Sequence, residues 1–547
     1  MSTRLLVVGA GLGALMAAGY VPSAEAKPAA ADQSSKEMSQ ELKALREQVE
    51  ALQRRLDAQA GADQQTKAQA DSAAAQAASA KAEAAALPAQ IHAEVQTAVA
   101  AAKPKTDKIY YKGVTLTLGG FSALESIYRS HGTTADISTS FGAIPYANGA
   151  VGHTSEFRFT ARQSRLAVLA QGDVSPQTHL GFYGEFDFQA AAQTGNSNES
   201  NSYSPRIRHL YGSVDWDDSG LHMLAGQNWS LVTLNSKGIT PRNEVAPPSI
   251  DAQYVPGFTW ARQPQLRLTK DFDKQLWLAV SLENPQTTFY TGANPFPSTV
   301  HVNYNSPAGS GFNSANTLSL NHVPDVVAKL AYETEIAERS VHVEVYGLYR
   351  NFYERLNYSN QSASGGGFGG GLTIPLIPKV LDFQVSGLGG KGIGRYGTSQ
   401  LADVTFDGAG NIRPIHEIAA LAGLTLHASP KLDLYLFAGE EKASAQPYNL
   451  TSGAGVITPY GYGNALYSNS GCVSETATGG CVGNTRLIEQ ATVGFWHKPY
   501  AGNYGKFQWG LQYSYTERKA FSGSGALDIV PIANDSMVFA SIRYYPF

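Results

Sequence analysis

Arginines are the residues of this sequence whose type and spacing point most directly to chemistry. Residues 156–171 have the sequence EFRFTARQSRLAVLAQ. In an extended chain Phe157 and Phe159 share one face, so Arg158 and Arg162 lie on the other face. A guanidinium group binds a carboxylate through two parallel hydrogen bonds. A row of such groups along a channel would therefore guide small anions such as mono- or dicarboxylates.

Further arginines extend this pattern along the chain. Arg165, just beyond the point where the alternation slips, and Arg206, Arg208 and Arg267 bring the predicted channel arginines to six. Arg242 and Arg262 are further arginines in the same part of the chain. An alternative is that the arginines pair with neighbouring carboxylates and only stiffen a wall. The candidate partners are Glu156, Glu185, Asp187 and Asp215. The formal net charge of −4 does not separate the two hypotheses.

Catalytic and metal-binding patterns are absent from the sequence. No HExxH or GxSxG motif occurs, and the 12 histidines are scattered. His209, His301, His322 and His342 are each compatible with a catalytic role, but single histidines within strands are usually wall residues. We therefore expect no enzyme activity, no cofactor and no metal site. The net charge also gives no reason to expect nucleic acid as a partner.

From residue 109 onward the chain shows the period-2 alternation of β-strands. VHVEVYGLYR places Val343 and Val345 on one face, with His342 and Glu344 on the other. The segments KLDLYLFAG, LGFYGEFDF and QWGLQYSYTER alternate in the same way. Charged residues make up 16% of the chain, below the roughly 25% of a typical soluble protein. Charged side chains on the polar faces disfavour a soluble sandwich, whose core would exclude them.

The connections between the predicted strands favour a membrane barrel. Gly-, Asn- and Ser-rich segments at 292–322, 359–371 and 444–485 indicate long loops, whereas DFDK at 271–274 indicates a tight turn. Long loops on one rim, short turns on the other and aromatic residues at strand ends are typical of outer-membrane barrels. About 440 residues suit about 16 antiparallel strands, with 18 as the alternative. An arginine facing lipid in mid-membrane costs roughly 2–4 kcal/mol, so arginines within strands should face the lumen or the rim.

Both ends of the chain support this assignment. The last strand alternates up to the terminal aromatic residue Phe547, which resembles the signal used by the machinery that inserts barrels into the outer membrane. Residues 1–26 have the charged start, apolar run and Ala24-Glu25-Ala26 site of a secretory signal peptide. The apolar run is shorter than the roughly 20 residues that a membrane-spanning helix needs. An even number of strands would place both barrel ends in the periplasm.

The region between the signal peptide and the barrel carries a heptad repeat. Residues 27–60 form a predicted periplasmic coiled-coil segment that oligomerises the chain, and residues 61–108 form an alanine-rich spacer. The apolar seam consists of Met38, Leu42, Leu45, Val49, Leu52 and Leu56. In a parallel coil Glu41 would face Arg46 of a neighbouring chain. A lone helix packed on the barrel mouth is the alternative, and we expect a homotrimer held by a three-stranded coil.

The only two cysteines, Cys472 and Cys481, lie in the loop SGCVSETATGGCVG. In a secreted protein this spacing favours a disulfide that closes a short loop. A zinc site is disfavoured because no histidine or further cysteine stands nearby.

Taken in order, the motifs resemble those of the DcaP-like trimeric outer-membrane porins. The resemblance rests on the coil ELKALREQVEALQRRL and the barrel motifs TARQSRL, GEFDF, RHLYG, LAGQNWSLV, QLRLT and SLENP. It implies a 16-stranded trimeric porin with a periplasmic coiled-coil stalk that takes up small, often negatively charged molecules such as dicarboxylates. It also implies that Arg158, Arg162 and Arg165, which fall in the ARQSR-type motif, line the channel.

The sequence therefore predicts a passive, substrate-preferring porin domain at 109–547 in a bacterial outer membrane. Lipid, lipopolysaccharide and small solutes are the expected partners. One alternative is a carbohydrate-type porin in which the 28 tyrosines and 6 tryptophans form an aromatic slide for sugar rings. Another is a structural barrel whose coil tethers the outer membrane to a periplasmic partner.

Overall fold

The structure is a computed structural model that describes residues 108–547, apart from 134, 191–203, 304–320 and 525–529, and a few positions between 67 and 81. The chain divides into two units, Met1–Pro104 and Lys105–Phe547. The described positions of the alanine-rich spacer are helical. No described helix is long and apolar enough to cross a membrane. The signal peptide and the heptad seam lie outside the described residues.

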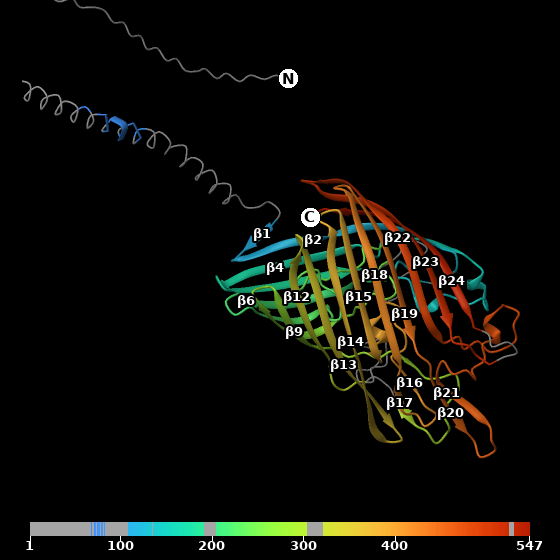
Figure 1. Ribbon diagram of the computed structural model, residues 1–547. Coiled ribbons are helices and arrows are strands. Elements are labelled where there is room, and N and C mark those ends of the chain that lie inside the picture. The colour runs from blue at the N-terminus through green and yellow to red at the C-terminus, as the bar shows by residue number, and fades with distance from the viewer. Residues whose placement is uncertain are drawn as a thin grey trace, which may run out of the picture. The chain divides into compact units, whose positions relative to one another are not determined.

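The second unit is a closed antiparallel β-barrel of 16 strands, as the alternating segments predict (Figure 1). Its strands are β2 (Val114–Arg129), β3 (Glu156–Thr160) continued by β4 (Arg165–Ser175), β5 (Thr178–Asp187), β6 (Arg206–Trp216), β7 (Leu221–Trp229), β8 (Arg262–Phe272), β9 (Leu276–Glu283), β12 (Asp325–Ile336), β13 (Arg339–Leu356), β14 (Ser359–Ile377), β15 (Leu381–Lys391), β18 (His416–Ser429), β19 (Leu432–Ala443), β22 (Thr485–Gly502), β23 (Gly505–Ala520) and β24 (Ile532–Tyr545).

The barrel closes between its first and last strands. β24 pairs antiparallel with β2, with Leu124 opposite Ile542. A short strand, β1 (Lys108–Tyr111), pairs with the first residues of β2, before the part of β2 that pairs with β24. Closure gives every strand two neighbours, so no edge is left with unpaired backbone groups.

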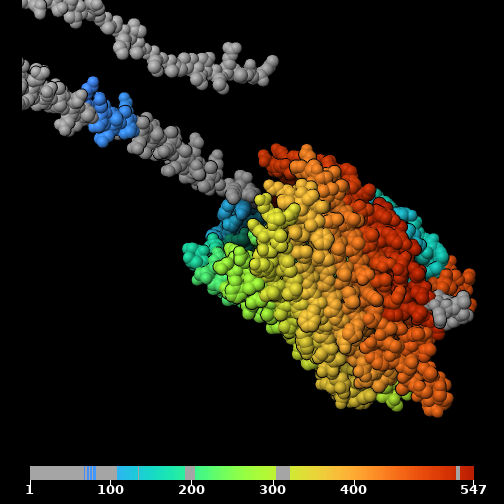
Figure 2. Space-filling view, in the orientation of Figure 1, coloured from blue at the N-terminus to red at the C-terminus, as the bar shows by residue number. Residues whose placement is uncertain are grey.

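The side chains follow the predicted alternation. In β3 the outward-facing Phe157 and Phe159 are 60% and 63% exposed, while Arg158 shares the inner face with Ile127 of β2. The predicted slip in this strand is real, because residues 161–164 interrupt it and separate β3 from β4. Figure 2 shows the outer wall formed by the later strands, in yellow to red. The apolar side chains therefore face outward and the charged ones face the lumen.

The two rims of the barrel differ. On one rim, which we name the short-turn rim, connections of two to four residues join the strands. The first barrel strand, β2, begins at this rim and the last, β24, ends there. The predicted turn at DFDK belongs to this rim, with Asp273 and Lys274 in the left-handed region. On the other rim, the long-loop rim, most connections are long, such as 130–155, 230–261, 392–415 and 444–484.

The glycine-rich stretch 359–371 is a strand and not the predicted loop. It belongs to β14, which is joined to β13 by a turn at Asn357 and Tyr358. The glycines leave room for inward-facing neighbours, since a Cβ at Gly369 would lie 2.4 Å from the ring of Tyr346. The composition suggested a loop, but the bare backbone of this strand accommodates the large side chain of Tyr346 in the preceding strand, β13.

Long-loop segments fold into the barrel and build an apolar core there. Its members include Phe141 and Ile144 from segment 130–155 and Phe258 from segment 230–261, packed against wall residues such as Phe437 and Phe539. Small sheets lie in these segments: β10 (Phe289–Tyr290), β16 (Val404–Phe406) and β17 (Ile412–Pro414) form one, and β20 (Gln446–Thr451) and β21 (Ile457–Tyr462) form another. β11 (Val302–Asn303) adds to β13.

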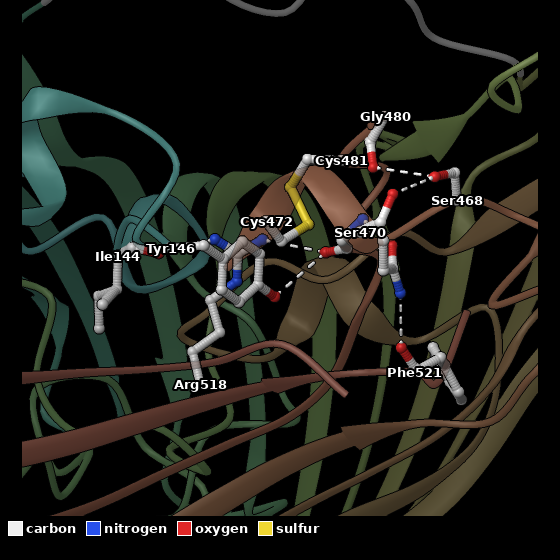
Figure 3. Close-up of a disulfide and its surroundings, with 11 residues drawn as sticks. Ile144, Tyr146, Ser468, Ser470, Cys472, Gly480, Cys481, Arg518 and Phe521 are labelled. Carbon is white, nitrogen blue, oxygen red and sulfur yellow. Dashed lines mark hydrogen bonds between the residues drawn. A yellow bond between two sulfur atoms is a disulfide. The ribbon is translucent and has the colours of Figure 1, made fainter. Parts of the chain in front are cut away.

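Cys472 and Cys481 form a disulfide within segment 444–484. Next to it, the hydroxyl of Tyr146 donates a hydrogen bond to the carbonyl of Gly483 at 3.2 Å. Arg518 of β23 donates to the carbonyl of Ile144 at 2.8 Å and lies over the Tyr146 ring (Figure 3). These contacts join segments 130–155 and 444–484 to the barrel wall.

Candidate functional site

Segment 230–261, between β7 and β8, crosses the interior of the barrel. We name it the inward segment. Near its start, the carboxylate of Glu283 accepts a hydrogen bond from the backbone N–H of Leu231 at 3.0 Å. Near its other end, the carboxylate of Glu441 accepts one from the N–H of Gly257 at 2.9 Å. Since β9 and β19 supply these anchors, the segment spans the lumen and narrows it.

Several wall carboxylates serve as acceptors for loop backbone. Glu344 accepts a bond from the N–H of Asn235 at 3.1 Å, and Glu417 accepts one from the N–H of Ile393 at 2.9 Å. Backbone N–H groups that enter a barrel interior need such partners, because an unpaired buried donor is costly. Part of the negative charge on the wall is therefore used to hold the long-loop segments in place.

A cavity of about 470 Å³ lies between the inward segment and the wall. Its charged lining residues are Arg165, Arg208, Arg242, Arg543, Glu185, Glu244 and Asp433. Arg242 and Glu244 come from the inward segment, and the others come from strands of the wall. The cavity therefore joins groups far apart in the sequence, and guanidinium groups are its commonest charged type.

Aromatic rings complete the lining of this cavity. Arg242 lies over the ring of Tyr183, with 5.8 Å between its guanidinium carbon and the ring centre. Arg543 lies 4.6 Å from the ring centre of Trp496 in the same way. Cation–π contacts of this kind hold a guanidinium group in position without neutralising its charge.

Four of the six predicted channel arginines form close pairs with carboxylates. The pairs are Arg158 with Glu156 (3.0 Å), Arg162 with Asp136 (3.2 Å), Arg206 with Asp187 (2.7 Å), and Arg208 with both Glu185 and Asp187. Three of the four carboxylates predicted as wall partners, Glu156, Glu185 and Asp187, thus form ion pairs with these arginines. Asp215 does not, because it lies 2.7 Å from His222.

Arg165 and Arg267 differ from these four. The nearest carboxylate oxygen to Arg165 belongs to Glu185 and is 3.8 Å away, and the Nε atom of Arg165 has no hydrogen-bond partner among the described residues. Arg267 is buried and donates to the side chain of Gln265 and the carbonyl of Trp229. Of the six predicted arginines, Arg165 and Arg208 line the cavity, and the other four do not.

The sequence prediction missed three charged residues of the cavity, Arg543, Glu244 and Asp433, and undervalued Arg242. Arg543 was not considered, although its position between the outward-facing Ile542 and Tyr544 would have placed it on the lumen side. Glu244 gave no signal. Arg242 was noted only as a further arginine and was not among the six predicted channel arginines. Arg262, noted in the same way, stacks on Trp229 and Trp260 and does not line the cavity. Arg242 and Glu244 are distinguished by their membership of the inward segment, which the sequence does not indicate.

Glu244 is the one carboxylate that the inward segment contributes to the cavity. Its Oε1 accepts a 3.4 Å hydrogen bond from Asn228, and its backbone pairs with that of Asn235. Burial raises the pKa of the Glu244 carboxyl, and the charge of Arg267 offsets part of this effect. The charge of Glu244 is therefore more sensitive to mild acid than that of an exposed glutamate.

Comparison with known proteins identifies the fold. No protein-family model matches the chain, and no curated protein matches it. The outer membrane channel DcaP of Acinetobacter baumannii is 19% identical, with a TM-score of 0.55 over 80% of this chain and 99% of that chain. The similarity confirms, at the level of the fold, the resemblance to DcaP-like porins and the barrel predicted from the strand pattern.

Two porins match with lower scores. The anion-selective porin from Comamonas acidovorans is 11% identical over 79% of this chain and 99% of that one, with a TM-score of 0.41. OprB of Pseudomonas putida is 10% identical over 78% of this chain and 93% of that one, with a TM-score of 0.43.

Proposed function

We propose that the protein is an outer-membrane porin whose water-filled channel allows passive uptake of small solutes and favours anions such as carboxylates and dicarboxylates. The closed barrel with an apolar outer wall and a charged interior supports a channel. The observation that carries the anion preference is the meeting of Arg165, Arg208, Arg242 and Arg543 at the inward segment.

The same proposal covers location and assembly. The fold shared with an outer-membrane channel supports insertion of residues 109–547 into the outer membrane, with Phe547 contributing to recognition by the insertion machinery. The signal peptide and the placement of both barrel ends on the short-turn rim support a periplasmic N-terminal region. In this proposal the heptad seam holds three copies together, and lipopolysaccharide surrounds the barrel.

Reversal potentials in planar bilayers test the proposed selectivity. With a KCl gradient across the bilayer, the wild-type channel should pass Cl⁻ more readily than K⁺. Arg242→Gln should reduce this preference, because it removes a guanidinium that no described carboxylate neutralises. Arg355→Gln is the matched control, since Arg355 is exposed and does not line the cavity. A cation preference of the wild-type channel would contradict the proposal.

One observation favours a carbohydrate-type porin as the second candidate. Tyr183, Trp229, Tyr254 and Trp496 line the same cavity, and such rings can stack on sugars. Blockage of the channel current by neutral oligosaccharides, with no selectivity between K⁺ and Cl⁻, would support this function in place of anion uptake.

A further inference from the structure

Two further cavities lie on the short-turn side of the inward segment, and we name them the mouth cavities. The larger, of about 590 Å³, has Arg242 in its lining, and the smaller, of about 450 Å³, has Asp433. Both residues also line the cavity at the inward segment that holds Arg165 and Arg208, which we name the arginine cavity. The mouth cavities therefore adjoin the arginine cavity and lie between it and the short-turn rim.

Three histidines line the mouth cavities, and each lies between two carboxylates, one at either ring nitrogen. The three bridges are His179 with Asp173 at 2.6 Å and Asp217 at 3.2 Å, His222 with Asp215 at 2.7 Å and Asp271 at 3.0 Å, and His427 with Asp433 at 2.9 Å and Asp382 at 3.0 Å. An ionised carboxylate only accepts hydrogen bonds, so both ring nitrogens must donate. Only the positively charged imidazolium form has two N–H donors, so the geometry fits three positive charges.

Each bridge joins neighbouring parts of the wall close to the short turns. His179 is the second residue of β5, and its carboxylates come from β4 and from the turn after β6. His222 is the second residue of β7, with carboxylates from β6 and β8 and the ring of Trp277 stacked on it at 5.6 Å between ring centres. The imidazolium groups are therefore held at fixed positions around the exit of the channel.

No other group in the described lining of the mouth cavities changes its charge near neutral pH. The remaining charged or titratable groups that face the bridges are Lys237 and Arg242 of the inward segment, Lys274 of the turn after β8, Tyr211, Lys270, which acts on Asp271, and Lys498, which lies 2.7 Å from Asp433. Ammonium, guanidinium, phenol and ionised carboxyl groups keep their charge between pH 6 and 9. The histidines are therefore the groups through which pH acts on these cavities.

We infer that His179, His222 and His427 set the anion preference at the short-turn mouth of the channel, and that the preference weakens when they lose their protons. This inference rests on the proposed anion channel. An imidazolium attracts an anion that leaves the arginine cavity, and its loss leaves both carboxylates of the bridge without their shared cation. These carboxylates then repel anions in the mouth cavity. The effect is a difference between two protonation states of one wall, so it does not depend on the total charge of the lumen.

Reversal potentials of the full-length protein in a gradient of dilute KCl test this inference, because dilute salt screens the mouth charges least. Between pH 6 and 9 the Cl⁻-to-K⁺ permeability ratio of wild type should fall by about two- to five-fold, the effect of a unit charge a few ångströms away in water. The double variant His179→Gln/His427→Gln removes the two bridges whose histidines are 35% exposed. It should have a lower ratio than wild type at pH 6 and a smaller decrease toward pH 9.

Two matched variants separate the mouth histidines from other causes. His497→Gln removes a histidine outside the lumen, since His497 lies opposite the outward-facing Trp509 and accepts a hydrogen bond from its Nε1 at 3.0 Å. It should behave as wild type. Glu244→Gln removes the titratable carboxyl of the inward segment and should keep the decrease toward pH 9.

The outcomes distinguish this inference from the function on which it rests. If the double variant keeps the wild-type ratio at every pH while its barrel is folded, as judged by heat-modifiable migration in gels, the inference is overturned and the anion channel stands. A wild-type ratio that stays constant from pH 6 to 9 overturns it as well. If the double variant does not fold, the single variant His179→Gln takes its place, with a smaller change expected in the same direction. If wild type shows no anion preference at any pH, the proposed function and this inference fail together.

Discussion

Glu185 illustrates how one carboxylate gives two arginines different roles. Arg208 is 2% exposed and contacts both Glu185 and Asp187, so its charge is fully used within the wall. Arg165 lies 3.8 Å from the same Glu185 and keeps an unpartnered Nε. The two hypotheses for the arginines, anion guidance and wall stiffening, therefore apply to different members of the same set.

Replacement of these two arginines should separate the roles. Arg208→Ala removes the close partner of Glu185 and one of the two partners of Asp187, so it should destabilise the barrel by up to about 3–5 kcal/mol. Arg165→Ala should lower the anion preference with a much smaller loss of stability, because its pair is longer and partly exposed. Urea-induced unfolding in detergent, followed by tryptophan fluorescence, measures both. Equal destabilisation by the two variants would contradict this division.

The raised pKa of Glu244 predicts that selectivity depends on pH. A raised pKa means that the carboxyl binds a proton at a higher pH than an exposed glutamate does. The groups that face it are Asn228 of β7, Arg267 of β8, Lys329 of β12 and Arg242 beside it. The arginines and the lysine keep their charge in mild acid, so protonation of Glu244 makes the cavity more positive.

The anion preference should therefore increase as the pH falls from 7.5 toward 5. Reversal potentials in a KCl gradient at several pH values measure the effect. Glu244→Gln should already have the high preference at pH 7.5 and should lose this part of the pH dependence. A wild-type preference that weakens on acidification would show that a different group dominates.

At the scale of single elements, period-2 alternation predicted which face of each strand is directed toward the lumen. Strands β5, β13, β19 and β23 all show this alternation. The inward segment had no such signal. Its anchors, Glu283 and Glu441, lie in other strands and are recognisable only once the barrel brings them together. The identity of the constricting loop, and hence the position of Arg242 and Glu244, thus depended on long-range contacts.

Strand β14 shows that composition alone can mislead, and Gly369 of β14 and Gly389 of β15 allow a matched test. A Cβ at Gly369 would lie 2.4 Å from the Tyr346 ring and 2.5 Å from the carbonyl oxygen of Gly387, whereas a Cβ at Gly389 would have its nearest neighbour at 3.9 Å. Gly369→Ala should therefore destabilise the barrel by about 1–3 kcal/mol through overpacking. Gly389→Ala should change its stability little. The urea concentrations at the midpoint of unfolding, measured in detergent, compare the stabilities of the two variants. Equal midpoints would contradict the packing argument.

At the scale of the whole molecule, the barrel and the N-terminal region are separable in principle. β24 pairs directly with β2, so closure of the cylinder uses no residue before Lys108. The heptad seam from Met38 to Leu56, by contrast, is proposed to bury its apolar side chains against other copies of the chain. Folding of the barrel and association of its copies should therefore depend on different parts of the chain.

Deletion of residues 36–102 tests this separation. The barrel should still fold and conduct with the same selectivity, because the inward segment and its anchors remain, but chemical crosslinking should no longer yield trimers. Deletion of residues 61–102 alone is the control and should preserve trimers, since it keeps the seam. Trimers that survive the longer deletion would show that the outer wall of the barrel holds the copies together. Intact trimers with normal conductance but a fragile cell envelope would instead favour the tether, because the coil would then serve a periplasmic partner.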